Sequence, residues 1–293
     1  MKVSIGIPFY NPGVYFKEAI ASVLNQTFTD FELILLDDGS SDGSLEVAHS
    51  FDDKRIKVIS DGTNNGLPYR LNQLITLSQG EYIARMDADD LSSSFRIAQQ
   101  VTLLEQTPDV DIIATGICSI TDNNNVTGYR LPASNKKMTP SVTDAIFGRS
   151  EIAHATILAR KSWYLRNRYN EKAKLMEDYQ LWIDATIQND LNVAYIKSPL
   201  YFYREESSVN YRKAVKAYFN GYKVVLNRYF SYLNLRDKIK ITLLMIIKIT
   251  VVSTANLFNL SDKLLDMRNK DTVQDKVLID KLKKELDQLR SNS

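Results

Sequence analysis

Residues 81–90 have the sequence Glu81-Tyr82-Ile83-Ala84-Arg85-Met86-Asp87-Ala88-Asp89-Asp90. The first six residues are typical of a strand, and the last four place three carboxylates directly after it. Uncompensated charge at the end of a buried strand is costly. A divalent cation that carries a phosphorylated ligand would compensate it, because Mg²⁺ and Mn²⁺ are often held by one or two carboxylates plus substrate phosphates. The stretch therefore predicts a metal and phosphate site, whereas Asp109-Val110-Asp111, a second Asp-x-Asp, is interpreted as an ordinary loop.

The sequence around this stretch alternates strand-like with helix-like segments, from residue 3 to about residue 120. Short apolar runs typical of strands lie at 3–9, 31–36, 56–59 and 112–120. Helical periodicity separates them at 15–25, 43–51, 67–77 and 95–106. This alternation predicts an α/β fold with a mostly parallel central sheet and helices on both faces. Ligands of such sheets bind outside the carboxyl ends of the strands, where functional residues are therefore expected.

Composition and charge narrow the class of protein. With 293 residues, 44% of them hydrophobic and 25% charged, the chain can form one large globular domain or two smaller ones. A net charge of only +2 gives no global field that demands nucleic acid, and no nucleic-acid partner is expected. The single cysteine, Cys118, excludes an internal disulfide framework and is interpreted as a core residue. Residues 1–5 enter a strand pattern without the layout of a signal peptide, so we expect a cytoplasmic catalytic part.

Polar signatures follow the other strands that should end at the same edge. The first strand is followed by Pro8-Phe9-Tyr10-Asn11, and the second by Asp37-Asp38-Gly39-Ser40-Ser41-Asp42-Gly43. A carboxylate such as Asp38 can accept hydrogen bonds from a base or a ribose, and an aromatic ring such as Tyr10 can stack on a base. The helix N-terminus after Gly66 and the guanidinium of Arg70 suit phosphate oxygens. Together these residues predict a nucleotide-diphosphate pocket with a metal ion.

The same motifs, taken in order, resemble those of family 2 glycosyltransferases, which are inverting enzymes of the GT-A fold. The resemblance covers about residues 3–205. Its elements are Pro8-x-Tyr10-Asn11, Asp37-Asp38-Gly39-Ser40-x-Asp42-Gly43, Asn65-Gly66 with Arg70-x-Asn72, Asp87-Ala88-Asp89-Asp90 with Arg96, His154, Arg160-Lys161, Glu177-Asp178-x-x-Leu181-Trp182 and Tyr203-Arg204. We accordingly expect a glycosyltransferase domain at 1–210, with a nucleotide-sugar-binding half at 1–120 and an acceptor half at 121–210. A helical extension is expected at 211–293.

The resemblance also implies a role for each site residue. Asp178 matches the catalytic base that takes the acceptor hydroxyl's proton, and Glu177 is its nearest rival. Asp89 would be the first metal ligand, with Asp87 contacting the ribose or, through water, a Mn²⁺ or Mg²⁺ ion that stabilises the leaving diphosphate. Asp90 is expected to be structural. The implied donor-binding residues are Pro8, Tyr10, Asn11, Asp38, Gly66, Arg70, Asp87 and Ala88. Those implied on the acceptor or diphosphate side are His154, Glu177, Trp182 and Arg204.

Simpler interpretations remain open for several of these motifs. Residues 37–40 are turn formers in many contexts. Glu177-Asp178 is also compatible with a solvated helix start, and His154 with a histidine satisfied by its neighbours. At the level of the whole chain, the alternatives are a nucleotide-sugar-binding protein without catalysis and a membrane scaffold whose tail is the functional part. A processive polysaccharide synthase is disfavoured because the sequence contains no Gln-x-x-Arg-Trp motif.

The last third of the chain has a different pattern. Tyrosines, phenylalanines and basic residues interleave at 211–235, and an apolar segment with two interior lysines follows at 239–260. We favour a helix that lies in the membrane interface, over a buried domain helix or a spanning helix. In the tail at 261–293, the spacing of Ile279, Leu282, Leu286 and Leu289 is that of a short coiled-coil seam. A solvated terminal helix is the slightly favoured interpretation of this tail, and the oligomeric state is left open.

The resulting functional hypothesis is a metal-dependent inverting glycosyltransferase. It would move one hexosyl or N-acetylhexosaminyl unit from a nucleotide-diphosphate donor to a saccharide acceptor carried on a polyprenyl-diphosphate lipid. The resemblance to short bacterial chains implies surface polysaccharide assembly, such as that of O-antigen or capsule, at the inner face of the cytoplasmic membrane. The donor sugar, its base, the acceptor and the preferred metal are not encoded in any pattern that we can interpret.

Overall fold

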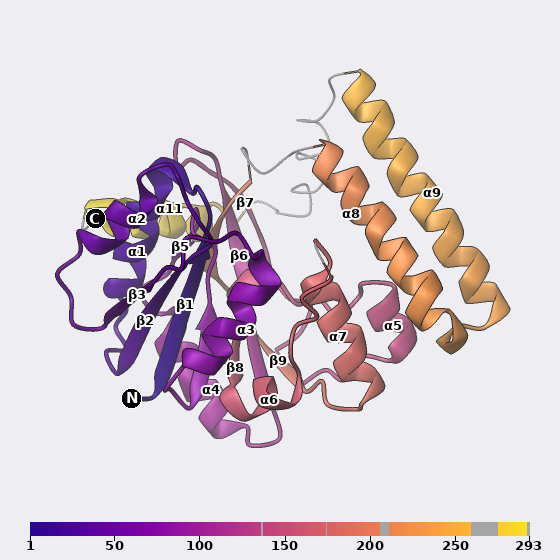
Figure 1. Ribbon diagram of the computed structural model, residues 1–293, viewed down its shortest axis with the longest axis horizontal. Helices are drawn as coiled ribbons and strands as arrows, with labels where there is room; N and C mark the ends of the chain where they lie inside the picture. The colour runs from indigo at the N-terminus through magenta and orange to yellow at the C-terminus, as the bar shows by residue number, and fades with distance from the viewer. Residues whose placement is uncertain (136, 174, 206–210, 259–274, 292–293) are drawn as a thin grey trace.

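A computed structural model describes residues 1–135, 137–173, 175–205, 211–258 and 275–291 of the chain (Figure 1). Its centre is a nine-stranded sheet in the order β3-β2-β1-β4-β8-β6-β9-β5, with β7 also paired to β6. The strands are β1 (Val3–Phe9), β2 (Phe31–Asp37), β3 (Ile56–Ile59), β4 (Tyr82–Arg85), β5 (Leu91–Ser92), β6 (Ile112–Ile120), β7 (Val126–Arg130), β8 (Leu158–Arg160) and β9 (Val193–Arg204). The helices of the main body are α1 (Phe16–Leu24), α2 (Ser44–His49), α3 (Leu67–Leu77), α4 (Arg96–Gln106), α5 (Val142–Ile146), α6 (Lys161–Arg166) and α7 (Glu177–Ile187).

The first four strands form the parallel part of the sheet. β1 pairs in parallel with β2 and β4, and β2 with β3. The registers Val3↔Phe31 and Val3↔Tyr82 align the starts of three strands, so their carboxyl ends reach the same edge. The α/β prediction is confirmed, and a mostly parallel sheet describes this half well. The other half is mixed, because β8 runs antiparallel to both β4 and β6, β5 and β7 also pair antiparallel, and only β6 and β9 pair in parallel.

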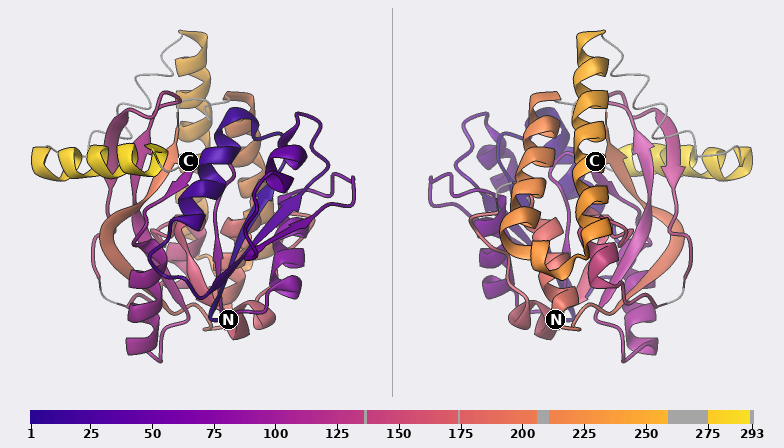
Figure 2. Two further views of the ribbon diagram at one scale, coloured as in Figure 1. Left: turned by 90° about the vertical axis from the view of Figure 1, so that its left-hand side faces the viewer. Right: turned by 90° about the vertical axis from the view of Figure 1, so that its right-hand side faces the viewer.

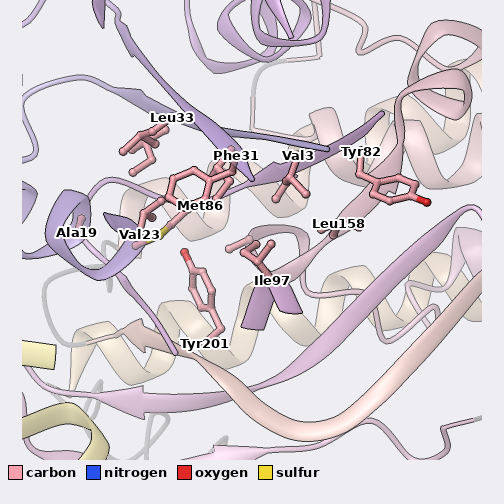
Figure 3. Close-up of a cluster of buried hydrophobic side chains, with 14 of the residues drawn as sticks. Val3, Ala19, Val23, Phe31, Leu33, Tyr82, Met86, Ile97, Leu158 and Tyr201 are labelled. Carbon is pink, nitrogen blue, oxygen red and sulfur yellow. The ribbon is translucent and has the colours of Figure 1, made fainter. Parts of the chain in front are cut away.

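Helices cover both faces of the sheet, as the sequence predicts. On one face the apolar side chains of α1 and α4, such as Val23 and Ile97, pack with Val3, Phe31 and Tyr82 of the strands (Figure 3). On the other face α3, α6 and α7 pack their apolar residues against the reverse side of the same strands. β1, β2 and β4 are thereby buried on both sides, which explains their mainly apolar sequences, whereas β3 at the edge of the sheet is only partly buried.

The C-terminal extension forms two separate structures. α8 (Tyr211–Val224) and α9 (Leu235–Leu257) make a helical hairpin that lies beside α5 and α7 (Figure 1). α11 (Lys276–Ser291) lies elsewhere, near α1 and β7 (Figure 2). In the described part of the chain, no helix has both the length and the apolar character that crossing a bilayer requires. Residues 239–257 of the predicted segment 239–260 belong to α9, Phe258 follows the helix, and residues 259 and 260 lie outside the described residues.

The prediction of a solvated terminal helix is wrong for α11. Its seam residues Leu282, Leu286 and Leu289 are only 1–4% exposed. They pack in one cluster with Leu91, Cys118, Ile120 and Phe202 of the sheet. The heptad-like spacing therefore reflects a buried face, and the partner is this chain's own sheet. The same contact confirms Cys118 as a core residue.

Candidate active site

The carboxyl ends of β1, β2 and β4 bring the predicted nucleotide residues to one edge of the sheet. Asp38 N donates to Phe9 O at 2.8 Å, and Met86 N donates to Gly6 O at 3.0 Å, so the three strand ends are joined by backbone hydrogen bonds. The Asn11 side chain accepts from Ser41 N at 2.7 Å, which ties the turn after β1 to the turn after β2. Pro8 is buried in β1, whereas the next aromatic, Tyr10, is 56% exposed. Tyr10 is therefore free to receive a planar ligand from solvent.

Asp38 lies at the centre of a hydrogen-bonded group of residues. We call this group the base-end cluster (Asp38, Asp61, Asn65, Gly66 and Arg70). Asp38 accepts from Asn65 N at 2.9 Å, from Gly66 N at 3.0 Å and from Arg70 Nε at 2.9 Å. Gly66 has a φ of +89°, which lets the backbone turn its N–H toward this carboxylate just before α3 begins. Most of the carboxylate's acceptor capacity is thus used within the protein.

Arg70 has a different role from the one predicted. All five of its N–H groups donate within the protein, to Asp38, Asp61, Thr63 O and Gln73. The side chain is 0% exposed, and its charge holds the pKa of Asp61 well below the usual range. A guanidinium has only five N–H donors, so none is left for a phosphate. The predicted phosphate contact is wrong because Arg70 instead fixes the 61–66 loop against Asp38.

The acidic turn after β4 separates into two half-buried carboxylates, Asp87 and Asp89, and one buried carboxylate, Asp90. Asp87 is about one-third exposed and pairs with the guanidinium of Arg85, which is itself 3% exposed. Asp90 is 1% exposed and accepts from Arg204 N at 2.7 Å and from Tyr201 Oη at 2.8 Å. Asp90 therefore holds the turn in place, as predicted. Ala88, which lies between Asp87 and Asp89, is buried. Asp87 and Asp89 are therefore the carboxylates of the turn that remain available to a ligand.

The position of the Arg204 side chain also differs from the predicted one. Its side chain is buried behind the acidic turn and donates to Asp89 O at 2.9 Å, to Thr121 O at 2.8 Å and to Asn124 Oδ1 at 2.8 Å. It therefore faces away from any acceptor and braces the backbone that carries Asp89. The expected placement on the acceptor or diphosphate side is wrong, because carbonyl groups of the β6–β7 turn occupy its donors.

Asp87 and Asp89 fit a divalent cation that completes its coordination on a ligand. Burial, followed by the charge of Asp87, raises the pKa of Asp89, and a bound cation would offset both effects. Among the described residues, no group of three histidines, cysteines or acids is arranged to hold a metal by itself. Mg²⁺ and Mn²⁺ sites that use one or two carboxylates take their remaining ligands from water and substrate phosphates. These two residues match that pattern.

The opposite part of the pocket comes from the N-terminus of α7. Asp178 lies in its first turn, where the helix dipole favours a negative charge, and its Oδ1 accepts from Tyr179 N at 2.7 Å. Burial raises the pKa of Asp178, and the charges of Arg85 and Asp87 act on it in opposite directions. Burial likewise raises the pKa of Glu177, on which Arg85 and Asp87 also act. The α7 acids and the β4 turn therefore share one electrostatic environment.

His154 and Trp182 stand next to these acids. His154 Nε2 is 2.8 Å from Tyr169 Oη, and the ring meets that of Trp182 edge-on at 6.0 Å. Burial, followed by the Arg85 charge, holds the pKa of His154 well below its usual range. The imidazole is therefore neutral near pH 7, and it offers a hydrogen bond rather than a positive charge to a diphosphate. Trp163 and Tyr164 are buried and pack in the core.

We call Arg85, Asp87, His154, Glu177, Asp178 and Trp182 the transfer-end cluster. Within the described residues, four buried side-chain N or O atoms have no hydrogen-bond partner, and three belong to this cluster: Arg85 Nε, Glu177 Oε2 and Trp182 Nε1. Folded proteins leave few buried polar groups unpaired. Three in one place indicate that a polar ligand or water completes the site. Sequence reasoning missed Arg85, although a charge inside an otherwise apolar strand was the available signal.

The mixed α/β sheet, the acidic turn after β4 and the pair of acids at the start of α7 are those expected of a glycosyltransferase of the GT-A class. Residues 4–168 match the family described as Glycosyl transferase family 2, and the chain belongs to this family. It is 34% identical over 221 residues to "Putative glycosyltransferase EpsE" of Bacillus subtilis (strain 168), covering 73% of this chain and 76% of the relative.

Solved structures show the same fold. The S. aureus protein TarS (residues 1–349), in complex with UDP-GlcNAc, superposes with a TM-score of 0.59 at 19% identity, over 91% of this chain and 78% of that one. The Pyrobaculum calidifontis mannosyltransferase PcManGT, in complex with GDP-Man and Mn²⁺, gives a TM-score of 0.59 at 14% identity, over 99% and 85%. At these identities the likeness establishes the GT-A fold.

Proposed function

We propose that this protein is a metal-dependent inverting glycosyltransferase that moves one sugar from a nucleotide-diphosphate donor to a saccharide acceptor. The observation that supports it best is the transfer-end cluster. It combines a candidate base, Asp178, with Asp87, whose turn also carries Asp89 and would hold a metal ion. One buried cation, Arg85, acts on the charges of all three carboxylates. Family membership supports the transfer of a sugar, and the geometry supports the more specific proposal.

The proposed reaction is a single displacement at C1 of the donor sugar. The acceptor oxygen attacks C1 while Asp178 removes its proton, and the C1–O bond to the diphosphate breaks with its electron pair leaving on the diphosphate. A cation held by Asp89 and Asp87 would supply Lewis-acid stabilisation of the leaving diphosphate. Attack from the side opposite the leaving group inverts C1, so an α-linked donor yields a β-linkage. The raised pKa of Asp178 makes it a stronger base than an exposed aspartate.

The donor's nucleotide is proposed to bind at the strand ends. Tyr10 would stack on the base because more than half of its surface is exposed, and Asp38 would accept from the base with its remaining capacity. Pro8, Asn11, Gly66 and Ala88 would shape the pocket through their backbone. That two proteins of the same fold were solved with UDP-GlcNAc and with GDP-Man supports a nucleotide-sugar donor but leaves open both the base and the choice between a hexosyl and an N-acetylhexosaminyl unit.

The acceptor is proposed to enter through the second half of the domain. A cleft of about 750 Å³ lies between β6, β7 and the 148–153 segment, and its lining includes Ala153, which directly precedes His154 in the sequence. Tyr129, Arg130 and Glu151 line it with groups that can bind sugar hydroxyls. We propose that the acceptor is a saccharide on a polyprenyl-diphosphate lipid, used in surface polysaccharide assembly such as that of O-antigen or capsule. The enzyme would then work as a peripheral protein at the inner face of the cytoplasmic membrane.

A donor screen tests this proposal. Nucleoside-diphosphate release is measured with a panel of UDP-, GDP- and dTDP-sugars, with Mn²⁺, with Mg²⁺ and with EDTA. We expect one donor to give nucleoside-diphosphate release that requires metal. Asp89→Asn should abolish this release, with or without added metal. Asp109→Asn is the matched control, because it alters the second Asp-x-Asp, whose exposed Asp109 pairs with Lys137. Release that is insensitive to EDTA, or absent with every donor, contradicts the proposal.

A further inference from the structure

α9 has two apolar faces but packs only one of them on the protein. Ile241 packs beside the cluster of buried residues formed with α5 and α7. The other face is open to solvent, on the outside of the molecule (Figure 2). The large apolar residues of this outer face are between 45% and 76% exposed: Ile239, Leu243, Ile246, Ile247, Val251, Leu257 and Phe258. A helix that is apolar all round requires an apolar environment on all sides, and soluble monomers rarely expose a continuous stripe of this kind.

The same hairpin is strongly basic. Residues 211–258 contain nine lysines and arginines and a single acid, Asp237, a formal charge of +8 in a chain whose total is +2. Lys216, Lys223, Arg236, Lys240 and Lys248 are exposed. Among the described side chains of the hairpin, only Arg228 forms an ion pair, with Asp184 at 3.4 Å. Lys240 and Lys248 lie over the rings of Phe147 and Tyr218, at 5.5 Å and 5.6 Å from the ring centroids. The charges of Lys216, Lys223 and Arg236 are left available to an external partner.

We infer that the outer face of α9 docks on an anionic lipid bilayer, with its apolar side chains inserted below the headgroups and the flanking lysines against the lipid charges. An apolar stripe bordered by basic residues is the pattern of helices that lie in a membrane interface. The alternative occupant, a second copy of this chain, would bring one strongly positive hairpin against another, which like-charge repulsion opposes. This inference deepens the proposed function. The docking itself does not depend on that function, but its biological purpose does, because a lipid-linked acceptor would be reached at the membrane.

The position of the hairpin connects this surface to the candidate active site. α8 lies between α9 and the start of α7, and Gly221 of α8 comes so close to Met176 that an added Cβ would lie 2.8 Å from Met176 Cε. Met176 directly precedes Glu177 and Asp178. A mainly apolar cavity of about 270 Å³ lies between the hairpin and the main body, lined by Met176, Tyr179, Gly221 and Leu244 among others. Docking through α9 would thus hold the candidate base within one helix layer of the lipid surface.

Vesicle sedimentation tests the inference without donor or acceptor. Full-length protein is mixed with phosphatidylcholine vesicles that contain phosphatidylglycerol, and with pure phosphatidylcholine vesicles. We expect sedimentation with the anionic vesicles, and about a tenfold or larger fall in partitioning for Leu243→Glu/Ile247→Glu. Lys216→Glu/Arg236→Glu, which alters two exposed cations, should lose the preference for anionic lipid. The matched control is Leu77→Glu/Leu165→Glu, which alters two leucines of the main body that are 39% and 55% exposed and should sediment like the wild type.

The possible outcomes separate the docking from the enzyme activity. Unchanged sedimentation of Leu243→Glu/Ile247→Glu, or wild-type protein that stays in solution with anionic vesicles, overturns the inference. So does a dimer in analytical ultracentrifugation that this pair of substitutions converts to a monomer, because the stripe would then bind a second copy. Circular dichroism checks folding, and the milder Leu243→Ser/Ile247→Ser replaces the pair if it fails. Since no sugar transfer is measured, loss of docking with retained donor turnover contradicts only this inference.

Discussion

In the base-end cluster, Arg70 donates all five of its N–H groups within the protein, and Asp38 accepts from two backbone N–H groups as well as from Arg70. In the transfer-end cluster, Arg85 is equally buried, but among the described residues its only carboxylate partner is Asp87, and its Nε has no partner. In the first cluster, the arginine has no N–H group left for a ligand, and the carboxylate keeps only part of its acceptor capacity. The second has polar groups that only a ligand or water can satisfy. Arg70 thus marks a region in which the protein supports its own structure. Arg85 marks the region in which substrate is expected.

The largest effect is expected at the candidate base. Asp178→Asn removes the proton acceptor while keeping nearly the same shape, so kcat should fall about 10³-fold or more, within the range for loss of a general base. Donor affinity, measured by isothermal titration calorimetry with the nucleotide sugar and Mn²⁺, should stay nearly unchanged. Glu177→Gln is the matched control on the neighbouring residue and should cost less. An active Asp178→Asn enzyme would refute the assignment and make Glu177 the candidate.

A matched pair of substitutions tests the difference between Arg70 and Arg85. Arg70→Met leaves Asp38 buried without its cation, and breaking a buried pair of this kind costs about 3–5 kcal/mol of unfolding free energy. Arg85→Met removes an incompletely bonded cation, and Asp87 is exposed enough to regain water, so about 1 kcal/mol or less is expected. Arg85→Met should instead lower kcat/KM about 100-fold, because it leaves Asp87 unpositioned and the Asp178 charge unbalanced. Urea unfolding and donor turnover give the two readouts. Equal losses of stability would show that the two arginines have the same role.

The folded chain explains which of these features the sequence could predict. Short apolar runs predicted the strands of the first half and helical periodicity predicted its helices. The fold rule then placed residues 8–11, Asp38 and the acidic turn at one edge. The roles of Arg70 and Arg204 were not predictable, because their partners are loop groups up to 115 residues away in sequence. The seam of α11 showed a buried face correctly, but no local pattern could identify Cys118 and Phe202 as its partners. Charged residues that become buried depend on long-range contacts, and a single sequence does not contain them.

A smaller effect is expected at the exposed end of the base pocket. Tyr10→Ala removes a ring that is 56% exposed and packs little on the protein, so the melting temperature should change by less than about 1 °C. If the ring stacks on the base, the loss is about 1–3 kcal/mol, and the donor KM should rise about 10-fold to 100-fold with kcat nearly constant. Tyr10→Phe keeps the stacking surface and is the control. An unchanged KM for Tyr10→Ala would remove the base from this position.

The smallest expected effect is a displaced pH profile, which compares the ionisation of the two clusters. Asp178 must be deprotonated to act as a base, so kcat/KM should fall as pH drops through its pKa. Because burial raises that pKa, the acidic limb should lie above the pH of about 4 at which an ordinary aspartate titrates. Arg85 opposes the shift, so Arg85→Met should move the limb further toward neutral pH.

His154 is held neutral by burial, and the profile should therefore show no step near pH 6.5. Initial rates of nucleoside-diphosphate release between pH 4 and 9 measure both features, with Arg70→Lys as the control for a buried arginine outside this cluster. A limb that Arg85→Met leaves in place would mean that Asp178 does not sense the Arg85 charge, and the division between a self-contained base-end cluster and a ligand-dependent transfer-end cluster would lose its electrostatic support.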